Sequence, residues 1–116
     1  MSDRLLLRIP ARAEWVFVAR LSVAAIATRL DLSVEDIEDL KLAVAEACAA
    51  CLREGDDAEI EIVCELRDET LEITVADFDE KTEGLGLVII KSLMESVEFR
   101  RDGSAGVALV MTKRVR

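Results

Sequence analysis

Two segments with strict alternation of apolar and polar residues constrain this fold most strongly. Residues 58–66 (AEIEIVCEL) and 70–78 (TLEITVADF) each place apolar side chains at every second position. This period is typical of β-strands that have one buried face. Only the polar residues Arg67, Asp68 and Glu69 separate the two segments. The pattern therefore predicts an antiparallel hairpin.

The remaining segments alternate between helical and strand patterns. A short strand is expected over residues 5–9, ending at Pro10, and a long amphipathic helix over 13–30. Ser33 has the character of an N-cap for a second helix, which is expected to run to about Arg53 and to end at Gly55. A third helix over 87–96 precedes strands over 97–101 and 107–113.

This element order predicts an α+β fold. We expect a single domain over residues 1–116, built as a two-layer sandwich. One mixed, mostly antiparallel sheet would carry all of the helices on one face.

Composition excludes several classes of partner. Twenty-four acidic against fifteen basic residues give a net charge of −9, which disfavours nucleic acid and anionic membranes and favours a protein partner. The longest apolar runs are too short to span a bilayer, and the N-terminus lacks the features of a signal peptide. A cytoplasmic protein is expected.

Three cysteines occur in a chain that has no histidine. Cys48 and Cys51 form a C-x-x-C motif, but they lie late in a helical pattern and on its apolar stripe. Thioredoxin-like sites place this motif at a helix start, and zinc sites usually need further ligands. We expect buried, free thiols and no metal site. A redox or metal sensor that uses Cys48, Cys51 and Cys64 is the weaker alternative.

Several motifs, in this order, resemble the histidine-kinase-like ATPase (GHKL) fold. Within it, the chain is similar to the bacterial anti-sigma-factor serine/threonine kinases. The segment LKLAVAEACAACLREG matches the second-helix motif of that family, and TLEITVADFD matches the strand that ends in the adenine-binding aspartate. GLGLVIIKSLMESVEF matches the second glycine box with its helix and following strand, and GVALVMTKRV matches the closing strand. The resemblance covers nearly the whole chain.

This resemblance implies roles for five residues at a nucleotide site. Glu46 takes the place of the general base, which would act here only if the protein is an active kinase. Asp77 takes the place of the adenine-binding aspartate, Gly84 and Gly86 match the glycines near the phosphates, and Thr112 matches a threonine near that aspartate. Each has a simpler explanation as a surface acid, a turn residue or a strand residue.

The first helix resembles the partner-contacting helix of the family. Arg20, in the segment EWVFVARLSVAAIA, takes the place of an arginine that faces the partner. The simpler alternative is a solvated arginine on an amphipathic helix.

Three departures from the family pattern concern ATP and magnesium. Ala50 stands where the family has the asparagine that ligates Mg²⁺, and a methyl group cannot coordinate the ion. Asp79 replaces a glycine of the first glycine box. Only residues 78–84 separate Asp77 from Leu85, so the mobile lid of the family is essentially absent. ATP and magnesium are implied by the resemblance, whereas these residues argue against them.

Two functions follow from the resemblance. The first is an anti-sigma-type regulatory protein with a degenerate ATP site, which binds a transcription regulator such as a sigma factor, or an anti-anti-sigma-like partner. The alternative is an active ATP-dependent serine/threonine protein kinase that phosphorylates such a partner. Family members often dimerise, so a homodimer is an open alternative to a monomer.

Overall fold

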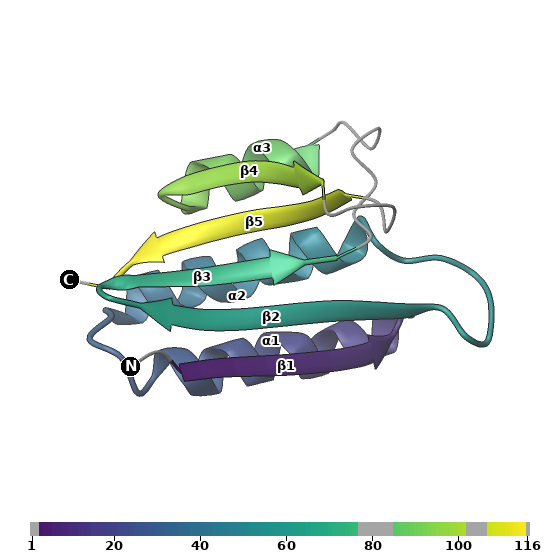
Figure 1. Cartoon of the computed structure of the whole chain (residues 1–116), viewed down its shortest axis with the longest axis horizontal. Coiled ribbons are helices and arrows are strands. Elements are labelled where there is room, and N and C mark those ends of the chain that lie inside the picture. Colours follow the sequence, from purple (N-terminus) through teal and green to yellow (C-terminus); the bar gives the residue numbers. More distant parts are fainter. Residues whose placement is uncertain (1–2, 77–84, 102–106, 116) are drawn as a thin grey trace.

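The computed structural model describes residues 3–76, 85–101 and 107–115 of the chain. Five strands and three helices follow one another in the order β-α-α-β-β-α-β-β (Figure 1). They are β1 (Asp3–Pro10), α1 (Ala13–Ala27), α2 (Val34–Ala49), β2 (Glu59–Arg67), β3 (Thr70–Val75), α3 (Leu85–Leu93), β4 (Ser96–Arg101) and β5 (Val107–Arg114). The expected α+β fold is confirmed.

The strands form one sheet in the order β1-β2-β3-β5-β4. All four pairings between the described strands are antiparallel. The described sheet is therefore antiparallel throughout, whereas a mixed, mostly antiparallel sheet was expected. The three helices of the described residues lie behind the sheet in Figure 1, and no described helix covers its other face. The molecule is therefore a two-layer sandwich with one open sheet face.

The N-terminus of α2 is capped as the sequence predicts. The Ser33 hydroxyl accepts a hydrogen bond from the Asp36 amide (3.0 Å), and the Asp36 carboxylate accepts one from the Ser33 amide (3.4 Å). This reciprocal arrangement satisfies two amides that the helix itself leaves without partners. The capping box therefore fixes where α2 begins.

Both long helices end earlier than their apolar patterns suggest. Helix α1 ends at Ala27 rather than residue 30, since the Arg29 and Leu30 amides bond to carbonyls three residues back. Helix α2 ends at Ala49 rather than near Arg53, because the Arg53 amide bonds to the Ala11 carbonyl instead. Gly55, with φ +119°, turns the chain before β2 and does not end the helix directly.

Helix α3 is shifted by two to three residues from the expected range of 87–96. It begins at Leu85 and ends at Leu93. The Glu95 amide donates to the Thr112 carbonyl of β5, which draws this segment into the sheet before β4 begins at Ser96. Within the described residues, no helix is long and apolar enough to cross a membrane.

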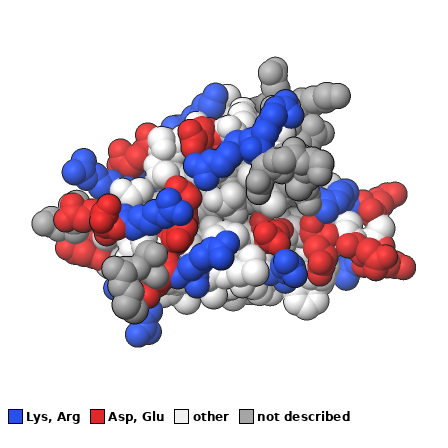
Figure 2. Space-filling model, viewed as in Figure 1, with Lys and Arg blue, Asp and Glu red and all other residues white. Residues whose placement is uncertain are grey.

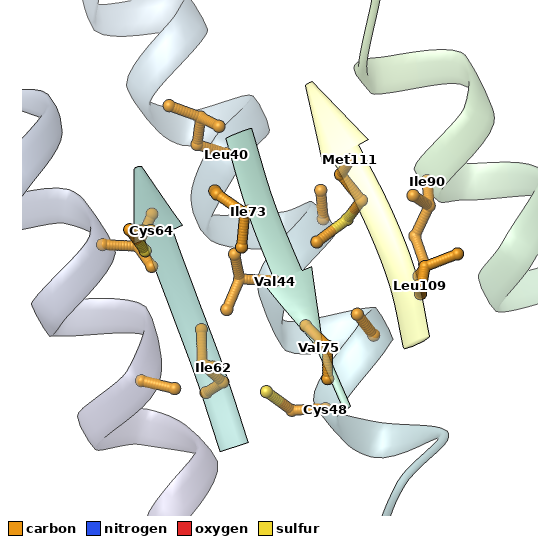
Figure 3. Packing of buried hydrophobic residues seen from close by; sticks show 14 of the residues in the cluster. Leu40, Val44, Cys48, Ile62, Cys64, Ile73, Val75, Ile90, Leu109 and Met111 are labelled. Atoms are coloured by element: carbon orange, nitrogen blue, oxygen red, sulfur yellow. The ribbon is translucent and has the colours of Figure 1, made fainter. Parts of the chain in front are cut away.

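The core lies between the sheet and the helices. Side chains from β2, β3 and β5 meet those of α2 and α3 (Figure 3). The largest fully buried side chains of this core are Leu40, Ile60, Ile62, Leu71, Ile73, Ile90, Leu109, Met111, Val23, Val44 and Val75. Burying this apolar surface is the main driving force for folding.

The three cysteines belong to this core. Cys48, Cys51 and Cys64 are all buried and free, which confirms the prediction for Cys48 and Cys51. Burial raises the pKa of the Cys48 thiol to about 12, with smaller contributions from Cys51 and Cys64. Burial also raises the pKa of the Cys64 thiol to about 11. Thiols that hold their protons so strongly are poor nucleophiles.

Candidate functional site

The candidate site lies where α2 meets the beginning of α3. Glu46, half-buried in the last turns of α2, directs its carboxylate at Gly86 in the first turn of α3. Its Oε1 atom lies 3.3 Å from the position that a Cβ atom on residue 86 would occupy. A side chain at residue 86 would crowd this oxygen, so glycine permits the close approach. The structure thus brings together Glu46 and Gly86, two of the residues that the sequence analysis singled out.

The position of the Glu46 carboxylate is favourable electrostatically. The first turn of a helix has amide groups without helical partners and the positive end of the helix dipole. A carboxylate there is stabilised much as a phosphate would be. The Glu46 carboxylate therefore lies at the helix end where a phosphate would be expected.

The expected magnesium ligand is absent. Ala50 is the C-cap of α2, and its amide donates to the Glu46 carbonyl at 3.2 Å, one turn away. Its methyl group packs against the core cluster and offers no oxygen atom to a metal. Across residues 3–76, 85–101 and 107–115, no group of three or more histidine, cysteine or acidic side chains could hold a metal ion. Among the described residues, position 50 therefore supplies no ligand for magnesium.

Two of the other nucleotide-site residues, Asp77 and Gly84, lie outside the described residues, as do Asp79 and the shortened lid segment. Their roles therefore stay predictions.

Thr112 lies away from Glu46 and Gly86. It is on β5 between the buried residues Met111 and Lys113, so alternation turns its side chain to the helix-free face. There its hydroxyl forms a hydrogen bond with that of Ser96 on β4. The structure does not bring Thr112 together with Glu46 and Gly86.

Arg20 lies in the middle of α1 and is only half-buried. The pKa of the Glu38 carboxyl on α2 is lowered mainly by its hydrogen bond from Lys41, and to a smaller degree by the charge of Arg20. Arg20 therefore lies toward α2 and not only toward solvent. Its Nε atom is buried without a hydrogen-bond partner among the described residues, which is unusual for a buried donor.

Lys113 is a structurally important residue that the sequence analysis did not single out. Its ammonium group donates to the Leu93 carbonyl at the end of α3 (2.7 Å) and lies 3.8 Å and 3.7 Å from the Asp36 and Asp39 carboxylates of α2. Lys113 is buried, and it connects β5 to both helices that form the site. Strand alternation could have predicted that Lys113 is buried, since residue 113 shares the inward face of β5 with Leu109 and Met111.

Comparison with known proteins identifies the family of the chain. Residues 9–113 match the family model described as the histidine kinase-like ATPase domain. This chain belongs to that family. Within the histidine kinase-like ATPases, it groups with bacterial serine-protein kinases of the RsbW type.

Two RsbW relatives illustrate the similarity. The chain is 33% identical to serine-protein kinase RsbW of Bacillus cereus (strain Q1), over 98% of this chain and 86% of that protein. It is 35% identical to serine-protein kinase RsbW of Listeria monocytogenes serotype 4a (strain HCC23), over 99% of this chain and 89% of that protein.

The fold is also similar to a solved structure, that of the RsbU and RsbW domains of Rv1364c from Mycobacterium tuberculosis. The TM-score is 0.78 at 18% identity, over 97% of this chain. The chain corresponds to about a third (32%) of that longer chain. At this identity, the match supports the fold alone.

Proposed function

We propose that this protein is an anti-sigma-type regulator that acts by binding a protein partner and whose ATP site is degenerate. The partner would be a transcription regulator such as a sigma factor, or an anti-anti-sigma-like protein. Membership of the RsbW-type family supports the regulatory role. The geometry around Glu46 and Gly86 supports the loss of phosphoryl transfer.

The observation that carries the proposal is Ala50 at the end of α2. Phosphoryl transfer depends on positioning and on neutralising the charge of the phosphates, largely by magnesium. Ala50 supplies no ligand one turn after Glu46, and Glu46 itself adds negative charge at the first turn of α3. A nucleotide would therefore meet a carboxylate without the cation that normally offsets it.

The alignment with a relative supports the same proposal. The alignment with the Bacillus cereus relative extends over 140 positions, 24 more than the 116 residues of this chain. The relative therefore has residues within the matched region that this chain lacks. Residues missing within the matched region are consistent with the loss of the ATP lid.

Calorimetric titration with ATP, with and without magnesium, tests this function. We expect magnesium to change the ATP affinity of the protein less than about threefold, or ~0.7 kcal/mol. Ala50→Asn alone should not create magnesium-dependent binding, because Asp79 and the short lid segment remain. Ala49→Asn, at the exposed neighbouring position, is the matched control. Micromolar, magnesium-dependent binding by the unmodified protein would instead support the active kinase.

A further inference from the structure

A second surface, distinct from the Glu46 site, lies at the free edge of the sheet. β1 is an edge strand of eight residues, and its outer side has no neighbouring strand within the described sheet. The unpaired backbone groups of such an edge can pair with another extended chain. Leu5 and Leu6 are 40% and 48% exposed, so β1 also presents apolar surface to solvent.

A groove of about 430 Å³ lies beside this edge, between the start of β1 and the end of α1. Its apolar walls come from both layers of the sandwich: Leu5, Ile26, Leu30, Cys64, Leu66 and Leu71. The early end of α1 at Ala27 leaves this corner of the sheet incompletely covered. The groove can take one or two apolar side chains that enter from the edge.

The charge around the groove is opposite to that of the whole protein. Residues 1–30 contain five arginines and two acidic residues, whereas residues 31–116 contain ten basic and twenty-two acidic residues. One charged residue that lines the groove is the exposed Asp3. The other two are Arg4 and Arg29, which are also exposed. Neither has an ion pair with an acidic side chain in the described part of the chain. The β1–α1 corner is thus a basic region on an acidic protein.

The alternation of β1 specifies which side chains an added strand would meet. Arg4, Leu6 and Arg8 lie on the helix-free face, opposite Glu65, Val63 and Glu61 of β2. That face carries acidic and basic side chains side by side (Figure 2). Leu5 and Leu7 lie on the other side of the strand, toward the helices and the groove. Arg8 already pairs with Glu61 at 3.0 Å, whereas Arg4 has no ion pair among the described residues. A residue opposite Arg4 should therefore be acidic, and a residue opposite Leu6 apolar.

From these features we propose that the β1 edge and its groove bind an extended acidic and apolar segment of a partner protein. The segment would add a sixth, antiparallel strand beside β1. One apolar side chain would enter the groove, and acidic side chains would pair with Arg4 and Arg29, while Arg8 keeps its ion pair with Glu61 (3.0 Å). Strand addition of this kind takes its affinity from backbone hydrogen bonds and its specificity from alternate side chains. This inference goes beyond the proposed function, because it concerns a surface away from both Glu46 and Arg20.

A labelled peptide tests the proposal directly. The probe is a capped, fluorescein-labelled peptide with the sequence Glu-Val-Val-Leu-Glu-Glu between Gly-Ser spacers, and its binding to the full chain is followed by fluorescence anisotropy. We expect saturable binding, and no binding of the matched peptide in which lysine replaces each glutamate. Hydrogen exchange should show that the acidic peptide protects the amides of β1 and not those of β4.

Charge reversal identifies the surface. Arg4→Glu with Arg29→Glu should weaken peptide binding at least tenfold, whereas Arg100→Glu with Arg101→Glu, on the opposite edge strand β4, should change it less than twofold. Leu5→Ser, which removes part of the apolar wall without a charge change, should weaken binding at least threefold.

Three outcomes would overturn the proposal. These are no binding of the acidic peptide at about 1 mM, equal binding by the two charge-reversal variants, or protection of β4 in place of β1. A concentration-dependent dimer that is lost on Arg4→Glu with Arg29→Glu, without peptide binding, would assign the edge to a second copy of this chain. None of these measurements depends on ATP or on a sigma factor, so failure here leaves the proposed function standing.

Discussion

At the scale of single residues, the contact between Glu46 and Gly86 determines what the candidate site can do. A carboxylate oxygen that lies 3.3 Å from the place of a missing Cβ leaves little free space at the first turn of α3. The site is therefore shaped by a side chain of the protein itself. Both the steric and the electrostatic side of this contact can be measured.

A double-mutant cycle measures the steric part. Gly86→Ala removes the conformational freedom of glycine, which normally stabilises a helix by up to about 1 kcal/mol. We expect almost no gain in the presence of Glu46, because its carboxylate must move away from the new methyl group. In a Glu46→Ala background, the same change should stabilise the protein by about 0.5–1 kcal/mol in urea unfolding. Equal effects in both backgrounds would show that the two residues do not touch.

The buried thiols predict a specific loss of stability at alkaline pH. The pKa values of Cys48 and Cys64 in the fold, about 12 and about 11, lie above the usual thiol value of 9.0. Above pH 9 the unfolded chain loses these protons while the folded chain keeps them, so the free energy of unfolding falls as pH rises. The slope should reach about 1.4 kcal/mol per pH unit for each thiol.

Chemical denaturation at pH 8, 9 and 10 measures this slope. Cys64→Ala should reduce the slope by about half. Titration of Lys and Arg contributes equally to both proteins and therefore cancels in this comparison. The buried thiols of the folded protein should also react with a thiol reagent far more slowly than those of the unfolded chain. Rapid labelling of Cys48 at pH 8, or an identical slope in Cys64→Ala, would contradict the assignment of these thiols to the core.

At the scale of elements, Lys113 connects β5 with α2 and α3. It lies on β5, donates to the last turn of α3 and faces two carboxylates in the first turns of α2. Since α2 carries Glu46 and α3 carries Gly86, Lys113 helps to hold the two sides of the candidate site in register. Its contribution is that of a positioning residue.

Lys113→Met tests this link with a side chain of similar size. The substitution leaves the Leu93 carbonyl without its donor and should destabilise the protein by about 1–3 kcal/mol. Lys41→Met, which breaks the more exposed pair with Glu38 (2.8 Å), is the control and should cost less than about 1 kcal/mol. Urea unfolding provides both values, and hydrogen exchange should show faster opening at the end of α3 in the Lys113 variant alone.

At the scale of the whole molecule, the two-layer sandwich leaves α1 available for partner contacts. Trp15, Phe17 and Leu21 on α1 remain 40%, 57% and 50% exposed. Arg20 lies on the same helix and is half-buried. These features support the proposal that α1 takes part in binding the partner.

Partner binding separates regulation by binding from catalysis. A pull-down from native cells, identified by mass spectrometry, supplies the partner for calorimetry. Arg20→Ala should weaken its binding at least tenfold, about 1.4 kcal/mol, with the fold intact by circular dichroism. Arg12→Ala, at the exposed N-cap of the same helix, should have less than a threefold effect, and Glu46→Ala should leave binding nearly unchanged. An essential Glu46 with a neutral Arg20 would indicate that catalysis survives.

Much of this molecule follows from local pattern. The alternation of residues 58–66 and 70–78 is sufficient for the hairpin of β2 and β3, and the capping residues Ser33 and Asp36 are sufficient for the start of α2. The apolar stripe of α2 correctly places Cys48 and Cys51 in the core. Such features depend on periodicity and on hydrogen bonds between near neighbours, which the sequence by itself determines.

Tertiary structure decides the features that depend on distant pairing. Helix α2 ends at Ala49, and the Arg53 amide donates to the Ala11 carbonyl instead of continuing the helix. The Glu95 amide donates to the Thr112 carbonyl before β4 begins. Likewise, the packing of α2 on α3 brings Glu46 to Gly86. These contacts join residues that are far apart in the chain, so no local pattern specifies them and only the assembled sandwich does.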